Sequence, residues 1–470
     1  IFNSTDSATF TNNNIFKNWL GATFTNQTPL TIQNTFINYG TIFSDSILTV
    51  KSSHTFKNYN KVRLRGTSKL VANGKLINYE KNADNDDNVD LSNDSGIITI
   101  TTNAKLTNDN SLSENRGYII SDNEFTNDST FTNSGTITLN NVPSRSTARG
   151  AVINNNSVFN NTGNININGN SKIDNNKTFN HNDGIILIEG LSGNSKKAEI
   201  ENNNGSTFNN NSNITINEFG KLHIKNTSTF NHNKLNIINN ELIKIESTGT
   251  FNNKSILDNK KKLEVKGILK NDKNITNTGD IINTKGIINA NIGTITNKNN
   301  IYNYDSIVNN GIININDTSD GGVIFNYKTF NNNNGAKLNI YDSFVNMEKG
   351  ASNLHYVDTT NDSGILRNTG IININRGLLE NKSRLINDYT ITITGSGTLT
   401  NKKNFYNQNN SVFTITDGKF TNDSYFYHTS SQTITNNDSI VNNGLFKDAY
   451  KITNNTAGTF TNDSILSLND

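Results

Sequence analysis

Residues 125–141 read FTNDSTFTNSGTITLNN, and this stretch contains the pattern that decides the fold. The apolar residues Phe125, Phe131 and Ile137 recur every six residues, and between them apolar side chains alternate with Thr and Asn. Alternation with a period of two is typical of short strands with one buried face. The polar pairs between the alternating segments tolerate the left-handed backbone that a tight corner needs.

The same phrase returns along the whole chain with a longer period. FTNDS occurs three times, and the unit apolar-x-Asn recurs at gaps that cluster at about 19 to 22 residues. Three sides of six or seven residues make one such turn. The sequence therefore predicts an all-β fold, a single elongated parallel β-solenoid that is three-sided with about 20 residues per coil.

The apolar residue of each repeat is predicted to face inward. Equivalent positions of successive coils would then stack into inner columns, so that each coil needs only two or three apolar side chains. The predicted inner-column residues are Phe36, Phe56, Leu76, Phe125, Phe159, Phe179, Phe230, Phe251, Phe344, Leu385, Phe405, Phe426 and Phe460.

Asparagine makes up about one residue in five and recurs in phase with the inner apolar residues. Identical amides one strand spacing apart can bond to each other in a ladder, because each carries both donors and an acceptor. The ladder candidates are Asn38, Asn58, Asn78, Asn127, Asn422 and Asn462. Two other interpretations stay open: asparagine tolerated on the surface through codon bias, and a ligand-binding array.

Composition excludes several classes of protein. Only 32% of the 470 residues are hydrophobic and the mean hydropathy is −0.60, so a thick globular core cannot be filled. The formal charge of +2 is mixed along the chain, which argues against a nucleic-acid partner. No apolar run reaches the length of a membrane span, and the absence of Cys excludes disulfides.

The period is irregular in a few places. Residues 1–35 are predicted to form irregular N-terminal coils or a cap, and residues 36–470 the solenoid itself. Loop insertions are expected near 80–95, 141–150 and 190–197, where the repeat is interrupted.

Candidate ligand sites are few, and no cofactor or catalytic residue is predicted. The best candidate for a cation site is the acidic group Asp84, Asp86, Asp87 and Asp90, since calcium binds several carboxylate oxygens on a flexible loop. The spacing does not match an EF-hand, because Val89 occupies the position that requires Gly. A solvated loop without a metal is the competing interpretation.

Two histidines occupy equivalent places in the repeat. His181 and His232 both lie in the phrase TFNHN, and the coil of Asn210 lies between them. They are therefore expected two strand spacings apart, too far to share one zinc ion. Carboxylates are scattered along the sequence and Arg is scarce, which disfavours a polysaccharide-degrading site.

The repeats resemble those of a known group of proteins. FTNSGTITLNN at 131–141, NNGIININ at 309–316 and NTGIININ at 368–375 are similar to the Asn-x-Gly-x-Ile-x-Asn repeats of filamentous haemagglutinin-like and other adhesin-like surface proteins of bacteria and archaea. The resemblance implies a right-handed, three-sided solenoid on the cell surface.

Together these features predict an extracellular structural protein that forms a rod or fibre at the cell surface. Self-association into filaments by end-to-end stacking is expected, because the sequence shows no element that would cover the last strands. The alternative is the shaft of an adhesin that binds glycans or proteins of a host or neighbouring cell. A polysaccharide-degrading enzyme is the third interpretation.

Overall fold

The structure is a computed structural model. It describes residues 2–4, 14–79, 96–101, 103–109, 113–140, 150–192, 197–316, 321–348, 364–448 and 451–468. Within these residues every regular element is a β-strand, sixty-two in all. The chain divides into an N-terminal unit, Ile1–Ile243, and a C-terminal unit, Lys244–Asp470, which are described separately.

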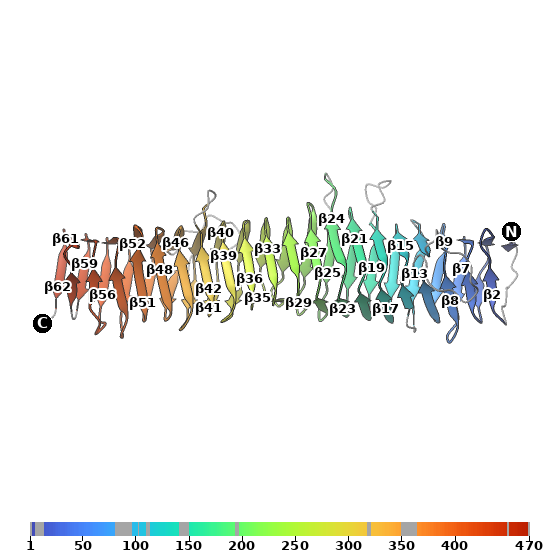
Figure 1. Cartoon of the computed structure of the whole chain (residues 1–470), viewed down its shortest axis with the longest axis horizontal. Helices are drawn as coiled ribbons and strands as arrows, with labels where there is room; N and C mark the ends of the chain where they lie inside the picture. Colours follow the sequence, from blue (N-terminus) through green and yellow to red (C-terminus); the bar gives the residue numbers. More distant parts are fainter. Residues whose placement is uncertain are drawn as a thin grey trace. The chain divides into compact units, whose positions relative to one another are not determined.

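Three strands make one turn of the N-terminal unit. Equivalent strands of successive turns pair into three parallel sheets, which we call A, B and C. A representative turn consists of β19 (Val152–Asn155) in sheet B, β20 (Val158–Asn161) in sheet C and β21 (Asn164–Asn168) in sheet A. The next turn begins with β22 (Lys172–Asn175) and β23 (Thr178–His181), which pair in parallel with β19 and β20 at a register of twenty residues. Figure 1 shows these strands in the blue and green part of the chain. The predicted parallel β-solenoid is confirmed.

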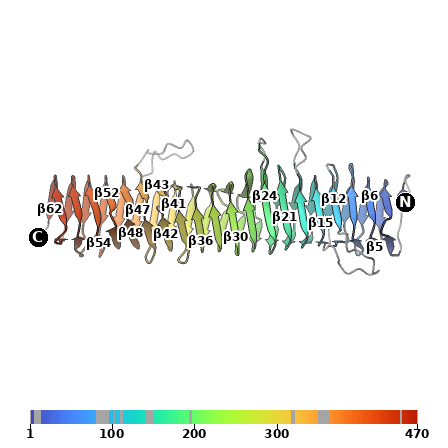
Figure 2. The same cartoon turned by 45° about the horizontal axis from the view of Figure 1, so that its top comes forward.

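The C-terminal unit repeats the same plan. β47 (Ile365–Asn368) lies in sheet C, β48 (Ile371–Asn375) in sheet A and β49 (Leu378–Asn381) in sheet B. β50 (Arg384–Asn387) and β51 (Thr390–Thr394) stack on the first two in parallel, nineteen residues later in the chain. Figure 2 shows these strands in the orange part of the chain, seen from a second direction.

Most strands bury every second side chain, as the alternating sequence requires. The first inward position is apolar in nearly every described strand of the three sheets, with Ser113 on sheet C as an exception. The second is mostly Asn in sheets B and C, as at Asn155 and Asn161, and mostly aliphatic in sheet A, as at Ile167. The interior of a turn therefore combines a small apolar centre with two buried amides.

Regular pairing begins before residue 36. β2 (Phe16–Asn18) pairs with β5 (Phe36–Asn38), and β4 (Leu30–Ile32) pairs with β7 (Ile47–Val50), in the same parallel register as later turns. The expectation that residues 1–35 form irregular coils or a cap stays a prediction. Pairing extends into this part because Phe16 and Leu30 align with Phe36 and Leu48 of the next turn.

The expected insertions fall largely outside the described residues. Those near 80–95 and 141–149, and residues 193–196 of the third, are not described. In the part of the chain that is described, no helix is long and apolar enough to cross a membrane.

Candidate functional site

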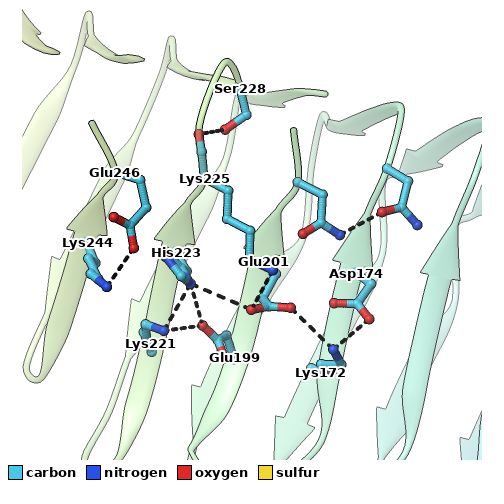
Figure 3. A network of polar contacts seen from close by, with 12 residues as sticks. Lys172, Asp174, Glu199, Glu201, Lys221, His223, Lys225, Ser228, Lys244 and Glu246 are labelled. Carbon is cyan, nitrogen blue, oxygen red and sulfur yellow. Dashed lines mark hydrogen bonds and ion pairs between the residues drawn. The ribbon is translucent and has the colours of Figure 1, made fainter. Parts of the chain in front are cut away.

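Among the residues that the structure describes, a concentrated group of charges lies on the outward face of sheet B in the N-terminal unit. It is carried by three consecutive strands of this sheet, β22, β25 (Ala198–Asn202) and β28 (Gly220–Ile224). The alternating sequences KIDN, AEIEN and KLHI place every second residue of these strands outward. We call the resulting set the sheet B charge cluster, and Figure 3 shows it. Its members are Lys172, Asp174, Glu199, Glu201, Lys221, His223 and Lys225.

Strand register aligns opposite charges in one row of the cluster, where Lys172 lies beside Glu199, which in turn lies beside Lys221. Opposite charges in neighbouring strands stabilise a sheet. In the second row Glu201 lies between His223 and a second carboxyl group, Asp174.

Glu201 is the centre of the cluster. Its two carboxylate oxygens lie 3.2 Å from Lys172 Nζ and 3.0 Å from Lys225 Nζ, and His223 Nδ1 lies 3.6 Å away. The neighbouring His223, together with Asp174 and Lys225, holds the pKa of Glu201 far below its usual range. Glu201 is therefore ionised at neutral pH.

Asp174 behaves in the opposite way, although it lies one strand spacing from Glu201. Burial and the neighbouring Glu201 carboxylate together raise its pKa to about 6, against the opposing effect of Lys172 at 2.7 Å. Two carboxyl groups that share one site cannot both ionise freely. The pair therefore takes up one proton as the pH falls toward 6.

Glu199, Glu201 and His223 form a compact set of possible metal ligands. Their donor atoms lie within 4.8 Å of one another, the one such group among the described residues. However, Lys221 Nζ lies 2.5 Å from Glu199 and Lys225 Nζ lies 3.0 Å from Glu201. A cation would have to displace both ammonium groups, so the residues do not fit a metal and the cluster is a network of ion pairs.

The sequence-predicted cation group is not part of this cluster. Asp84, Asp86, Asp87 and Asp90 lie outside the described residues. The calcium site remains a prediction.

The predicted inner-column residues lie on two sheets. Phe125, Phe344 and Phe460 are on sheet B, and the other ten are on sheet C. All except Phe460 are no more than 2% exposed. Phe460 aligns with Ile440 of the preceding turn, but it stays partly exposed because no described turn covers its other side.

Asparagine ladders are confirmed in both units. Asn38 Nδ2 donates to Asn58 Oδ1 at 2.7 Å, and Asn58 Nδ2 donates to Asn78 Oδ1 at the same distance, in sheet C of the N-terminal unit. The candidates on sheet B continue the pattern at 2.6 to 2.8 Å: Asn127 donates to Asn155, Asn422 to Asn442, and Asn442 to Asn462. Most of these amides are fully buried, whereas Asn462 in the last turn is exposed.

Histidine replaces asparagine in the sheet C ladders. His181 and His232 align with Asn210 between them, as the sequence predicts, and both are fully buried. Asn161 Nδ2 donates to His181 Nδ1 at 2.9 Å, so the ring proton is on Nε2, which donates to the carbonyl of Asn213 at 3.2 Å. Burial lowers the pKa of His181 to about 4. His181 is therefore a neutral structural member of the ladder.

Sequence reasoning missed the sheet B charge cluster, although a signal was present. The phrases KIDN and AEIEN alternate charged and apolar residues, but Lys172 and Glu199 are separated by an interruption of the repeat, so their alignment could not be read from the period. Arg65 also has an acidic partner that spacing did not reveal: its Nε and Nη2 donate to both oxygens of Asp45, one turn earlier.

No protein-family model matches this chain, and no curated protein matches it either.

Proposed function

We propose that the chain is an extracellular structural protein, whose solenoid units form a fibre or shaft at the cell surface. The observation that carries this proposal is the pair of buried amide ladders in each unit, in sheets B and C. In sheet C of the C-terminal unit, for example, Asn332 donates to Asn368, Asn368 to Asn387 and Asn387 to Asn407, at 2.6 to 2.7 Å. Each turn is thereby tied to the next by side chains as well as by backbone, which favours a mechanical role.

The largest charge cluster supports a structural role over a catalytic one. Its carboxylates are bound by lysines of the same or the next strand, and Lys221 and Glu199 are the tightest of these pairs. A general acid or base needs access to a substrate proton. We therefore propose that the cluster fastens adjacent turns and that the protein is not an enzyme.

Stacking of one molecule on another is the finer form of the proposal. A parallel strand and an inner amide can both be continued by an identical turn of a second molecule, as in cross-β assemblies. The resemblance of the repeats to filamentous haemagglutinin-like adhesins favours the same location, the cell surface, and the same type of role.

Electron microscopy of the purified chain across a range of concentrations tests the proposal. We expect filaments that lengthen as the concentration rises, with a repeat along the axis near the strand spacing of about 4.8 Å. Separate particles at every concentration would contradict stacking. Labelling of intact and permeabilised cells with one antibody tests the location, and signal only after permeabilisation would contradict it.

A further inference from the structure

A column of glycines hollows one corner of the N-terminal unit, between the end of sheet C and the start of sheet A. Five consecutive turns place Gly at the residue before the sheet A strand: Gly96, Gly117, Gly135, Gly163 and Gly184. A Cβ added at Gly135 would lie 2.0 Å from the carbonyl oxygen of Gly117, and one at Gly163 would lie 1.9 Å from that of Gly135. Backbone fills the space where a side chain would be, so no other residue fits.

Four of these glycines, Gly117, Gly135, Gly163 and Gly184, line an open cavity of about 440 Å³. One wall carries the residues that precede the glycines, which include Ser134, Thr162 and Asp183. The other wall carries the first residues of β15 (Tyr118–Ser121), β18 (Thr136–Leu139) and β21. We call this cavity the glycine groove. Its lining repeats once per turn, about every 4.8 Å, so it suits an extended ligand that runs along the stacking direction.

The backbone of the groove is already fully engaged in the fold. Tyr118 N donates to Gly96 O, Thr136 N donates to Gly117 O and Asn164 N donates to Gly135 O, each at 2.9 Å. A peptide that adds to a sheet edge needs free backbone groups, and these are bonded between turns. A ligand must therefore be recognised by the side chains of the two walls.

Those side chains suit a polyhydroxylated ligand. Thr136 offers a hydroxyl that can both donate and accept. The hydroxyls of Ser134 and Thr162 donate to the carbonyls of Asn115 and Asn133, so they are left to accept. The Oδ1 of Asn164 accepts from Ile185 N, so its amide nitrogen is left to donate. Tyr118, at one end of the groove, is 47% exposed. A sugar ring has one apolar face and a rim of hydroxyls, and an exposed aromatic ring beside polar side chains complements both.

The charges around the groove favour a neutral ligand. Arg116 at one end is paired with Glu114 at 2.7 Å, and Glu114 also binds Lys75 at 3.1 Å. Asp183 at the other end carries the opposite charge to Arg116. The groove thus has no excess of one sign that would select an anionic chain.

From this geometry we propose that the glycine groove binds an extended, neutral oligosaccharide, stacked on Tyr118 and hydrogen-bonded to the hydroxyl and amide side chains of the walls. This function goes beyond a structural role: it gives the N-terminal unit a recognition surface. The proposal does not depend on filament formation.

Isothermal titration of the full chain with cellohexaose, mannohexaose and chitohexaose tests the proposal. We expect at least one of them to bind the unchanged protein. Tyr118→Ala should weaken that binding by about tenfold, because the stacking platform is lost. Thr136→Trp should abolish binding, because the indole fills the groove.

Thr294→Trp is the matched control. Thr294 begins β39 (Thr294–Asn297), a sheet A strand of the C-terminal unit, and it also follows a glycine, Gly293. This variant should bind as the unchanged protein does. Circular dichroism spectra and urea unfolding midpoints verify that each variant is folded. If Thr136→Trp fails to fold, Ser134→Trp replaces it, because Ser134 is an exposed residue of the groove wall. Absence of binding by all three sugars, or binding that survives the filled groove, would overturn the proposal.

Discussion

Two regions of the molecule fill the same inner position in different ways. In the N-terminal unit the rings of Phe159 and Phe179 stack along sheet C, with centroids 4.7 Å apart and planes 6° from parallel. In the C-terminal unit Phe405 of sheet C meets Phe413 of sheet A and Phe420 of sheet B edge to face, at 5.7 and 5.9 Å. Phe426, next along sheet C, lies 4.7 Å from Phe405 with its plane tilted by 56°, so the parallel stack is lost where rings of all three sheets meet. The repeat therefore fixes where a side chain points, and its neighbours on the facing sheets decide what it contacts.

The largest expected effect comes from removing one ring in each unit. Phe179→Ala and Phe405→Ala should each lower the free energy of unfolding by about 3 to 5 kcal/mol, because both rings are fully buried. Urea denaturation of the full chain measures this loss.

Double-variant cycles then separate the two packing modes. Phe159 and Phe179 should couple by about 1 kcal/mol along the column, and Phe405 and Phe420 should couple by a similar amount across the core. If Phe159 and Phe179 couple no more strongly than two distant residues do, the difference between packing along the column and packing across the core is disproved.

The inner amides should matter equally in both units. Asn155 of sheet B donates to Asn175 Oδ1 at 2.7 Å and to the carbonyl of Thr178 at 2.9 Å, and Asn387 of sheet C in the other unit donates to Asn407 Oδ1 at 2.6 Å. Replacement of either by Ala should cost about 3 kcal/mol, because buried partners are left without a bond. The outward-facing Asn160 is the control, and Asn160→Ala should change the unfolding free energy by less than about 0.5 kcal/mol. A similar loss at Asn160 would show that burial is not the cause.

Acid should weaken the N-terminal unit through His181. Its pKa is about 4 in the folded chain and 6.5 in its ordinary state, so the unfolded chain binds the proton first as the pH falls. Stability is fully present above pH 6.5 and declines between pH 6.5 and 4, by up to about 3 kcal/mol. His181→Asn restores the amide of a regular ladder and should flatten this decline. Unfolding midpoints at pH 7 and pH 4.5 provide the measurement, and an unchanged pH dependence in the variant would exclude His181 as the source.

The smallest effects are expected from the surface charges. Lys225 binds Glu201 in the N-terminal unit, and Lys402 binds Glu380 at 2.7 Å in the C-terminal unit. Lys225→Met and Lys402→Met should each cost about 1 kcal/mol or less, and 1 M salt should reduce both losses. If Lys225→Met lowers the free energy of unfolding far more than Lys402→Met does, and if 1 M salt does not reduce that loss, the sheet B charge cluster has a role beyond fastening adjacent turns.

The sequence was sufficient for the fold class, the three-sided turn and the amide ladders, because each depends on a pattern of period two inside a segment of six residues. It was not sufficient for the assignment of residues to sheets. Phe125 and Phe159 have the same local pattern, yet they lie on sheets B and C, because the three sides of a turn are alike in sequence. The sheet B charge cluster was missed for a related reason. Lys172 and Glu199 are 27 residues apart, and only the actual length of the interrupted turn brings them side by side.

The buried and the outward-facing amides point in opposite directions along the stack. Asn155 donates to Asn175 of the following turn, whereas Asn180 on the outer face of sheet C donates to Asn160 of the preceding turn. Backbone dipoles of a sheet largely cancel, so these side chains set the electrical polarity of a unit. The dipoles of the inner and the outer amides therefore oppose each other. A further turn can continue both sets only when its chain runs in the same direction, which makes any growth by stacking directional.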